Sequence, residues 1–104
     1  MDFSAMTSRA LAIRGLFEDH ERKTFGRSWT REELALGLVG DVGDLAKLVQ
    51  AAEGVRQIDG AQEKLGHELA DVLWSVIVLA DICEIDLEAA FTRTMNEIER
   101  SLAS

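Results

Sequence analysis

The sequence predicts an all-α fold, a bundle of four helices in a single domain of residues 1–104 that assembles as an oligomer. The chain holds 104 residues and no proline, and no convincing run of alternating apolar and polar residues indicates a strand. It also lacks an internal repeat at the length that solenoid folds use. Four stretches instead show apolar residues at helical spacing, separated by short breaks. Helices of this kind bury their apolar faces by packing on one another.

The first helix is expected from Ser4 to about Lys23, where apolar residues recur at helical spacing among charged ones. The segment 25–29 follows it and carries a glycine and two aromatic residues, Phe25 and Trp29. The glycine interrupts the helical pattern. These two aromatic residues are therefore expected in a short loop at one end of the bundle.

The second helix is expected to begin at Thr30 and to run to about Glu53. Thr30 and Glu33 have the spacing of a capping box, in which each side chain accepts a hydrogen bond from the backbone N–H of the other residue. The core positions predicted for this helix share one apolar stripe, and they are Leu34, Leu38, Val42, Leu45 and Val49.

The third and fourth helices complete the bundle. A loop with a glycine at each end, residues 54–60, leads to the third helix, which is expected from about Ala61 to Cys83. The second half of this helix is apolar nearly all round, so it should be the central helix. Asp86 is expected to cap the fourth helix. The apolar stripe of the fourth helix comprises Leu87, Phe91, Met95, Ile98 and Leu102.

Composition and charge narrow the class of protein. The formal net charge is -8, and an acidic excess of this size argues against binding to nucleic acid or to an acidic membrane. The single cysteine, Cys83, excludes an intrachain disulfide and favours a reducing compartment. The chain shows no signal-peptide pattern and no uninterrupted apolar run of membrane-spanning length. We therefore expect a soluble, cytoplasmic protein with no membrane partner.

Two pairs of carboxylates give the clearest functional signal. Asp41 and Asp44 lie three residues apart on the second predicted helix, and Glu68 and Asp71 have the same spacing on the third. This spacing places each pair on one helical face. Four carboxylates on facing apolar helices would repel one another, and a hard divalent cation with oxygen ligands is the usual compensation. The pairs therefore predict a divalent metal site between the two helices.

Two stretches of the chain resemble the motifs of the MazG-like all-α NTP pyrophosphatases. The family's Glu-Glu-x-x-Glu helix, in the form found in its dCTP pyrophosphatase branch, resembles LALGLVGDVGDLAKLVQ. Its Glu-Glu-x-x-Asp helix resembles HELADVLWSVIVLAD, and the resemblance extends from about Ile13 to Arg100. It implies a hydrolase of the nucleotide pool that cleaves a nucleoside triphosphate, dCTP-like or modified, between the α and β phosphates. The products would be a monophosphate and pyrophosphate.

The resemblance also implies roles for particular residues. Mg²⁺, with Mn²⁺ as a substitute, would be held by the two carboxylate pairs, which are Asp41, Asp44, Glu68 and Asp71. Asp44 and Glu68 would also take part in catalysis. Loop aromatics would contact the base, and polar side chains of the second and fourth helices would approach the phosphates. The expected substrate contacts are Phe25, Trp29, Lys47, Arg93 and Asn96.

Two other classes of protein stay in consideration. A di-iron or di-manganese bundle would need Glu-x-x-His on two helices, whereas Glu68 is followed at that spacing by Asp71. A non-catalytic helical dimer that binds a nucleotide or a protein partner is the second alternative. It is suggested by Thr94 and Ile98, which stand where the family members considered carry a lysine and an asparagine near the phosphates.

A homodimer or homotetramer is expected, because a chain of this length has a core too small to cover an apolar third helix on all sides. Trp74, Ile77 and Val78 are expected to stay partly exposed in one chain and to form the subunit interface. The family resemblance implies that the nucleotide would lie in a cleft to which a second subunit contributes.

Overall fold

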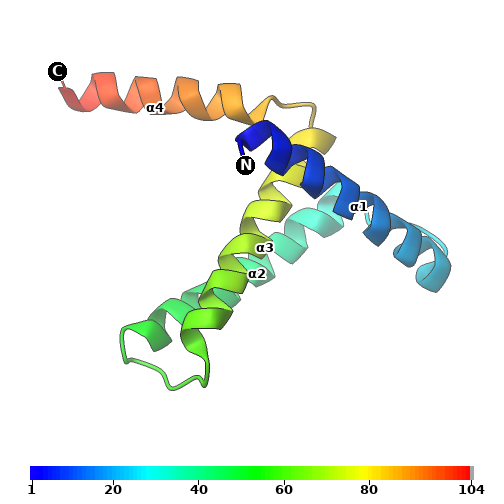
Figure 1. Cartoon of the computed structure of the whole chain (residues 1–104), viewed down its shortest axis with the longest axis horizontal. Helices are drawn as coiled ribbons and strands as arrows, with labels where there is room; N and C mark the ends of the chain where they lie inside the picture. The colour runs from blue at the N-terminus through cyan, green and yellow to red at the C-terminus, as the bar shows by residue number, and fades with distance from the viewer. Residues whose placement is uncertain (104) are drawn as a thin grey trace.

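A computed structural model describes residues 1–103 and shows four helices, with no strand among these residues (Figure 1). The helices are α1 (Phe3–Phe25), α2 (Arg31–Ala52), α3 (Ala61–Ile82) and α4 (Leu87–Ala103). The predicted all-α class is confirmed, and the helices begin and end close to their predicted bounds. No helix in this part of the chain combines the length and the hydropathy that crossing a bilayer requires.

The helices begin and end at recognisable local signals. The Thr30 hydroxyl accepts the N–H of Glu33 at 3.2 Å, and Glu33 Oε1 accepts the N–H of Thr30 at 3.0 Å, so the predicted capping box is confirmed. Asp86 Oδ1 accepts the N–H of Ala89 at 3.1 Å and caps α4 as expected. α1 ends at Phe25 and is capped by Gly26, whose φ of +80° is a left-handed conformation that glycine adopts without strain.

The α2–α3 hairpin is the main packed unit of the chain. The two helices run antiparallel and are joined by the loop at residues 53–60, while α1 crosses α3 near the end that lies away from this loop (Figure 1). The indole Nε1 of Trp74 donates to the carbonyl oxygen of Ala10 at 3.1 Å and so ties α3 to α1. Among residues 1–103, the buried apolar side chains are Ala10, Leu48, Ile77 and Val78.

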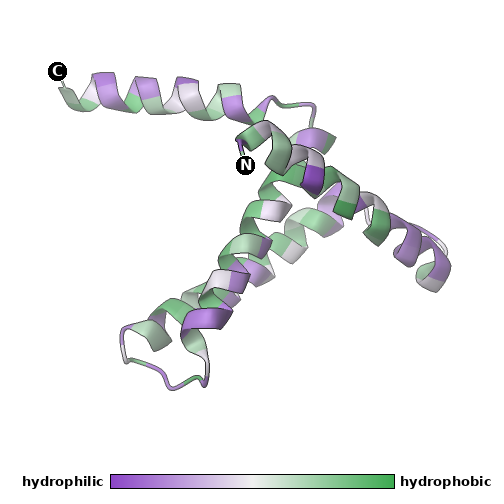
Figure 2. Cartoon of the chain, in the orientation of Figure 1, coloured by the Kyte–Doolittle hydropathy of each residue, from purple (hydrophilic) through white to green (hydrophobic). Residues whose placement is uncertain are grey.

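α4 lies apart from the other helices of its own chain. It leads away from the end of α3 as an extended arm, and every residue from 91 through 103 is exposed (Figure 1). Hydrophobic and hydrophilic residues alternate along this arm (Figure 2). Its exposed apolar side chains are Phe91, Met95, Ile98 and Leu102. The predicted fourth helix therefore forms, but its apolar stripe is not covered within one chain.

Two predictions about buried positions are wrong. Ile77 and Val78 are only 4% and 1% exposed, so they belong to the chain's own core and not to a subunit interface. α1 packs against α3, and Ile77 lies beside Ala10 and Ile13 of α1. On α2, Val42 and Val49 are each 47% exposed, and the buried residue is Leu48. The other predicted positions, Leu34, Leu38 and Leu45, are half-buried as expected, so only part of the predicted stripe lies off the buried face of α2.

Candidate metal centre

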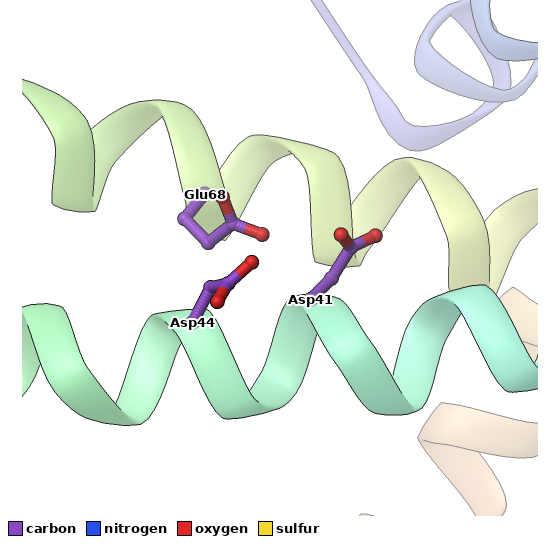
Figure 3. A group of neighbouring side chains, drawn as sticks. All are labelled: Asp41, Asp44 and Glu68. Atoms are coloured by element: carbon purple, nitrogen blue, oxygen red, sulfur yellow. The ribbon is translucent and has the colours of Figure 1, made fainter.

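Three of the four acids predicted to bind a metal converge between α2 and α3. Asp41 and Asp44 of α2 and Glu68 of α3 each place one carboxylate oxygen within 4.8 Å of the others. Figure 3 shows Glu68 reaching from α3 toward the two aspartates of the facing helix. Several carboxylate oxygens this close together match the ligands that a hard divalent cation prefers.

Glu68 is the acid most affected by this arrangement. Burial raises the pKa of its carboxyl group, and the negative charges of Asp41, Asp71 and Asp44 raise the pKa further. His67 acts in the opposite direction and lowers it. Glu68 Oε1 is buried and has no hydrogen-bond partner among residues 1–103. Because a buried unpartnered carboxylate oxygen is unfavourable, a cation bound here would stabilise it, and the residues present therefore fit a divalent metal.

Asp71 lies outside the close group of three acids. Its Oδ2 is 3.2 Å from Nε2 of His67, which precedes it by one turn on α3. Asp71 is nevertheless near enough for its charge to raise the pKa of Glu68. The four predicted ligands thus divide into three that converge and one that lies beside them.

A hollow of about 330 Å³ opens beside the acids on the side of the α2–α3 loop, and we call it the lysine hollow. Asp44 and Glu68 line it together with Lys47 and Lys64. Lys47, a predicted phosphate contact, therefore shares a hollow with two of the predicted metal ligands. Lys64 was not predicted, although it lies one turn before Glu68 on α3 and its spacing indicates the same helical face.

A second hollow, of about 480 Å³, lies on the side of the acids that faces α1, and we call it the α1–α3 hollow. Asp41 and Asp71 line it, together with the aromatic side chains of Phe17 and Trp74. The two rings are tilted by 59° with their centroids 5.3 Å apart. Phe17 was not singled out from the sequence, because only the crossing of α1 over α3 brings it near the acids.

The two aromatic residues that were expected to contact the base lie at the far end of α1 (Figure 1). Only Trp29 is in the connecting segment as expected, because α1 extends through Phe25. The rings of Phe25 and Trp29 are 5.1 Å apart between centroids. The chain from Trp29 to Asp41 is almost wholly helical, so a rise of about 1.5 Å per residue separates these residues by about 18 Å. Within one chain, the structure does not bring this aromatic pair to the acids.

A buried ion pair on α1 holds the backbone of Trp29. Glu21 Oε1 accepts the N–H of Trp29 at 2.8 Å, and Arg14 Nη2 donates to the carbonyl oxygen of Trp29 at 3.2 Å. Arg14 and Glu21 are themselves 4.0 Å apart, and both are buried. They were not predicted, although opposite charges two helical turns apart on one face are a signal that could have found them.

Arg93 and Asn96, the remaining predicted phosphate contacts, lie on α4. They line an open hollow of about 500 Å³ on that arm. α4 leads away from the α2–α3 hairpin, so one chain does not bring these side chains to the acids (Figure 1).

The fold and the acidic cluster together define an all-α protein with a candidate divalent-metal site shared by two antiparallel helices. A model of the MazG nucleotide pyrophosphohydrolase domain matches residues 29–101, which include α2, α3 and most of α4. The chain therefore belongs to the MazG family, a family of hydrolases that act on nucleotides. No curated protein and no solved structure matches the chain.

Proposed function

We propose that the protein is a Mg²⁺-dependent nucleoside triphosphate pyrophosphohydrolase that accepts Mn²⁺ as a substitute. It would convert its substrate to a nucleoside monophosphate and pyrophosphate. The observation that carries this proposal is the convergence of Asp41, Asp44 and Glu68 within 4.8 Å, in a chain that matches the MazG domain.

The metal would be held by these three carboxylates, with Asp71 beside them. When bound, a divalent cation supplies positive charge to the phosphate oxygens and lowers the pKa of an attacking water. Asp44 and Glu68 line the lysine hollow, where the phosphates would lie. This position supports a role for these two carboxylates in orienting the water by accepting its hydrogen bonds.

The lysine hollow would receive the phosphates that leave as pyrophosphate. Lys47 and Lys64 offer ammonium groups that donate charge-assisted hydrogen bonds to phosphate oxygens. Their positive charge matters because the whole chain carries a formal net charge of -8, which repels a free triphosphate. The same acidic excess favours action on free nucleotides over nucleic acid, and the single cysteine, Cys83, favours a reducing, cytoplasmic setting.

We further propose a homodimer or homotetramer in which a second copy covers the apolar stripe of α4. The accessible surface of the chain is 7610 Å², whereas a compact monomer of this mass exposes about 5,800 Å². The radius of gyration is 16.5 Å, whereas a compact chain of this length has about 13 Å. The excess surface of roughly 1,800 Å² falls in the range that one subunit buries in an obligate interface.

Association would also provide a role for the polar face of α4. Arg93 and Asn96 do not reach the acids of their own chain, because α4 extends away from the hairpin (Figure 1). In a closed assembly, these side chains of one copy would approach the phosphates bound by another copy. We propose this shared arrangement as the way in which the fourth helix contributes to the site.

A nucleotide panel tests the proposed function. Canonical and damaged nucleoside triphosphates are incubated with Mg²⁺, with Mn²⁺ or with a chelator, and monophosphate and pyrophosphate are quantified. We expect the two products in equal amounts from at least one nucleotide, and no products with the chelator. Diphosphate and inorganic phosphate as products would contradict the proposal. Binding without any turnover would support the alternative, a non-catalytic helical dimer that binds a nucleotide or a protein partner.

A further inference from the structure

We infer that the lysine hollow binds a pyrophosphate group on its own, without an attached nucleoside. The inference rests on the proposed function and adds two consequences to it. Inorganic pyrophosphate should bind directly to this hollow. A nucleotide should also need both a β- and a γ-phosphate to fill it, so the hollow selects triphosphates over diphosphates.

The lysines are distributed unevenly over the chain. The sequence contains three lysines, and two of them, Lys47 of α2 and Lys64 of α3, line this one hollow. The chain as a whole carries a formal net charge of -8, so two ammonium groups in one small hollow stand out from an acidic background. A local concentration of positive charge of this kind attracts an anionic ligand.

The two ammonium groups are available to such a ligand. Lys47 and Lys64 share the hollow with two of the acids, yet neither lysine forms an ion pair or a hydrogen bond with another side chain among residues 1–103. His67 also lines the hollow, but its Nε2 lies 3.2 Å from Oδ2 of Asp71. The lysines are therefore the cationic groups of the hollow that have no partner in the described chain.

The remaining walls of the hollow agree with a small anion. The buried Leu48 and the half-buried Ile58 add apolar surface beside the charged groups, and such surface strengthens the attraction between charges. Ile58 belongs to the α2–α3 loop, where Arg56 Nε donates to Gln50 Oε1 at 2.6 Å and ties the loop to α2. The volume of about 330 Å³ is near the lower end of the range for small-molecule sites, about 300–1,000 Å³. The hollow thus suits a part of a nucleotide, such as two linked phosphates.

The hollow also borders the proposed metal site. Asp44 and Glu68 belong both to its lining and to the group of three converging carboxylates (Figure 3). Each lysine ammonium offers three hydrogen-bond donors and a full positive charge. Two linked phosphates present enough oxygens to meet both lysines and the metal site together, whereas the terminal phosphate of a diphosphate presents fewer. This difference is the physical basis for selecting triphosphates.

Calorimetry with inorganic pyrophosphate and Mg²⁺ tests the inference on the full chain. The double variant Lys47→Gln with Lys64→Gln, which we call the lysine variant, removes both ammonium groups and keeps polar side chains. We expect saturable binding of pyrophosphate to the unmodified protein. The affinity of the lysine variant should be at least about tenfold weaker, because it lacks the charge-assisted hydrogen bonds.

Lys23→Gln with Arg31→Gln is the matched control, because it also removes two positive charges, both exposed and both outside the hollow. The control should bind pyrophosphate as the unmodified protein does. Mn²⁺ affinity should not fall in the lysine variant, since an ammonium group repels a cation. Equal pyrophosphate affinities in the lysine variant and the unmodified protein, no binding by either, or an equal loss in the control would overturn the inference. A parallel loss of Mn²⁺ affinity in the lysine variant would assign the defect to the metal site and would also overturn it.

Kinetics separate this inference from the proposed function. The ratio of kcat/KM for a nucleoside triphosphate to that for the corresponding diphosphate should fall by at least about tenfold in the lysine variant and stay unchanged in the control. An unchanged ratio in the lysine variant would overturn the selection of triphosphates. If the unmodified protein hydrolyses no nucleotide, the proposed function fails, while calorimetry still decides whether the hollow binds pyrophosphate. If the protein hydrolyses nucleotides but binds pyrophosphate equally well without the two lysines, only this inference fails.

Discussion

The metal-free fold disfavours the ionised form of the Glu68 carboxyl group, and a bound cation would stabilise that form. Its pKa is raised by burial and by the charges of Asp41, Asp71 and Asp44, so the folded chain disfavours its ionised form. We predict that Glu68→Gln and Asp44→Asn each abolish metal-dependent pyrophosphate release. The metal-free variants should melt at the same temperature as the unmodified protein or slightly higher, because each substitution removes a repelling charge. Circular dichroism in chelator and a pyrophosphate assay check both outcomes.

A large loss of thermal stability in metal-free Glu68→Gln, with metal binding unchanged, would contradict this prediction. It would show that the carboxylate has a structural role and that the metal site lies elsewhere.

Glu33 behaves in the opposite way to Glu68. Hydrogen bonds from Arg27 and from the Thr30 backbone lower the pKa of its carboxyl group from 4.5 to about 2. Because the pKa is depressed in the folded chain, the stability contributed by the ionised group is present above about pH 4.5. It is lost as the pH falls from about 4.5 toward about 2. We predict that Glu33→Gln lowers the melting temperature at pH 7. The difference in melting temperature from the unmodified protein should shrink as the pH falls through this range.

Melting curves recorded from pH 7 to pH 2 check the prediction for Glu33. Glu32→Gln is the matched control, since Glu32 is an exposed acid in the same first turn of α2. The prediction fails if the difference in melting temperature between Glu33→Gln and the unmodified protein stays constant with pH. It also fails if Glu32→Gln shows the same dependence on pH.

The joint between α1 and α2 depends on the buried Arg14 and Glu21 pair, which holds both backbone polar groups of Trp29. Removing Glu21 leaves the buried Arg14 with only the half-buried Glu18, 3.7 Å away, as an acidic neighbour, and breaking a buried ion pair destabilises proteins by about 3–5 kcal/mol. We predict a loss of about 3 kcal/mol in the free energy of unfolding for Glu21→Ala, measured with urea. The double variant Arg14→Met with Glu21→Leu should lose less, because it leaves no unpaired charge. Equal losses in the single and double variants would show that charge burial is not the cause.

The helices themselves were predictable because their ends depend on local chemistry. The Thr30 and Glu33 capping box and the Asp86 cap are formed by residues three positions apart, which a sequence shows directly. The i,i+3 spacing of the acids likewise fixed which side chains share a helical face. What the sequence could not show was the face of α2 that packs on α3, or the place where α1 crosses α3. These depend on contacts between distant segments, and Leu48 and Phe17 were missed for that reason.

The whole chain has more surface than a compact monomer, and the exposed stripe of α4 is the largest structural reason to expect association. We predict that Ile98→Asp reduces the oligomer size in sedimentation, because it places a charge within the apolar stripe. Asn96→Asp adds the same charge to the polar face of α4 and should leave the oligomer size unchanged. Ile77→Asp should unfold the chain instead, because Ile77 is buried within it. A monomeric unmodified protein at micromolar concentration that still hydrolyses nucleotides would contradict the shared-site proposal.

The proposed metal site is tested most directly by titrating Mn²⁺ into the unmodified protein and into Glu68→Gln, with free Mn²⁺ measured by electron paramagnetic resonance. Glu63→Gln is the matched control, because Glu63 is an exposed acid of α3 outside the converging group. We predict saturable binding to the unmodified protein and to Glu63→Gln, and an affinity at least about tenfold weaker for Glu68→Gln. Equal affinities for Glu68→Gln and the unmodified protein, or no Mn²⁺ binding by either, would contradict a metal site between α2 and α3.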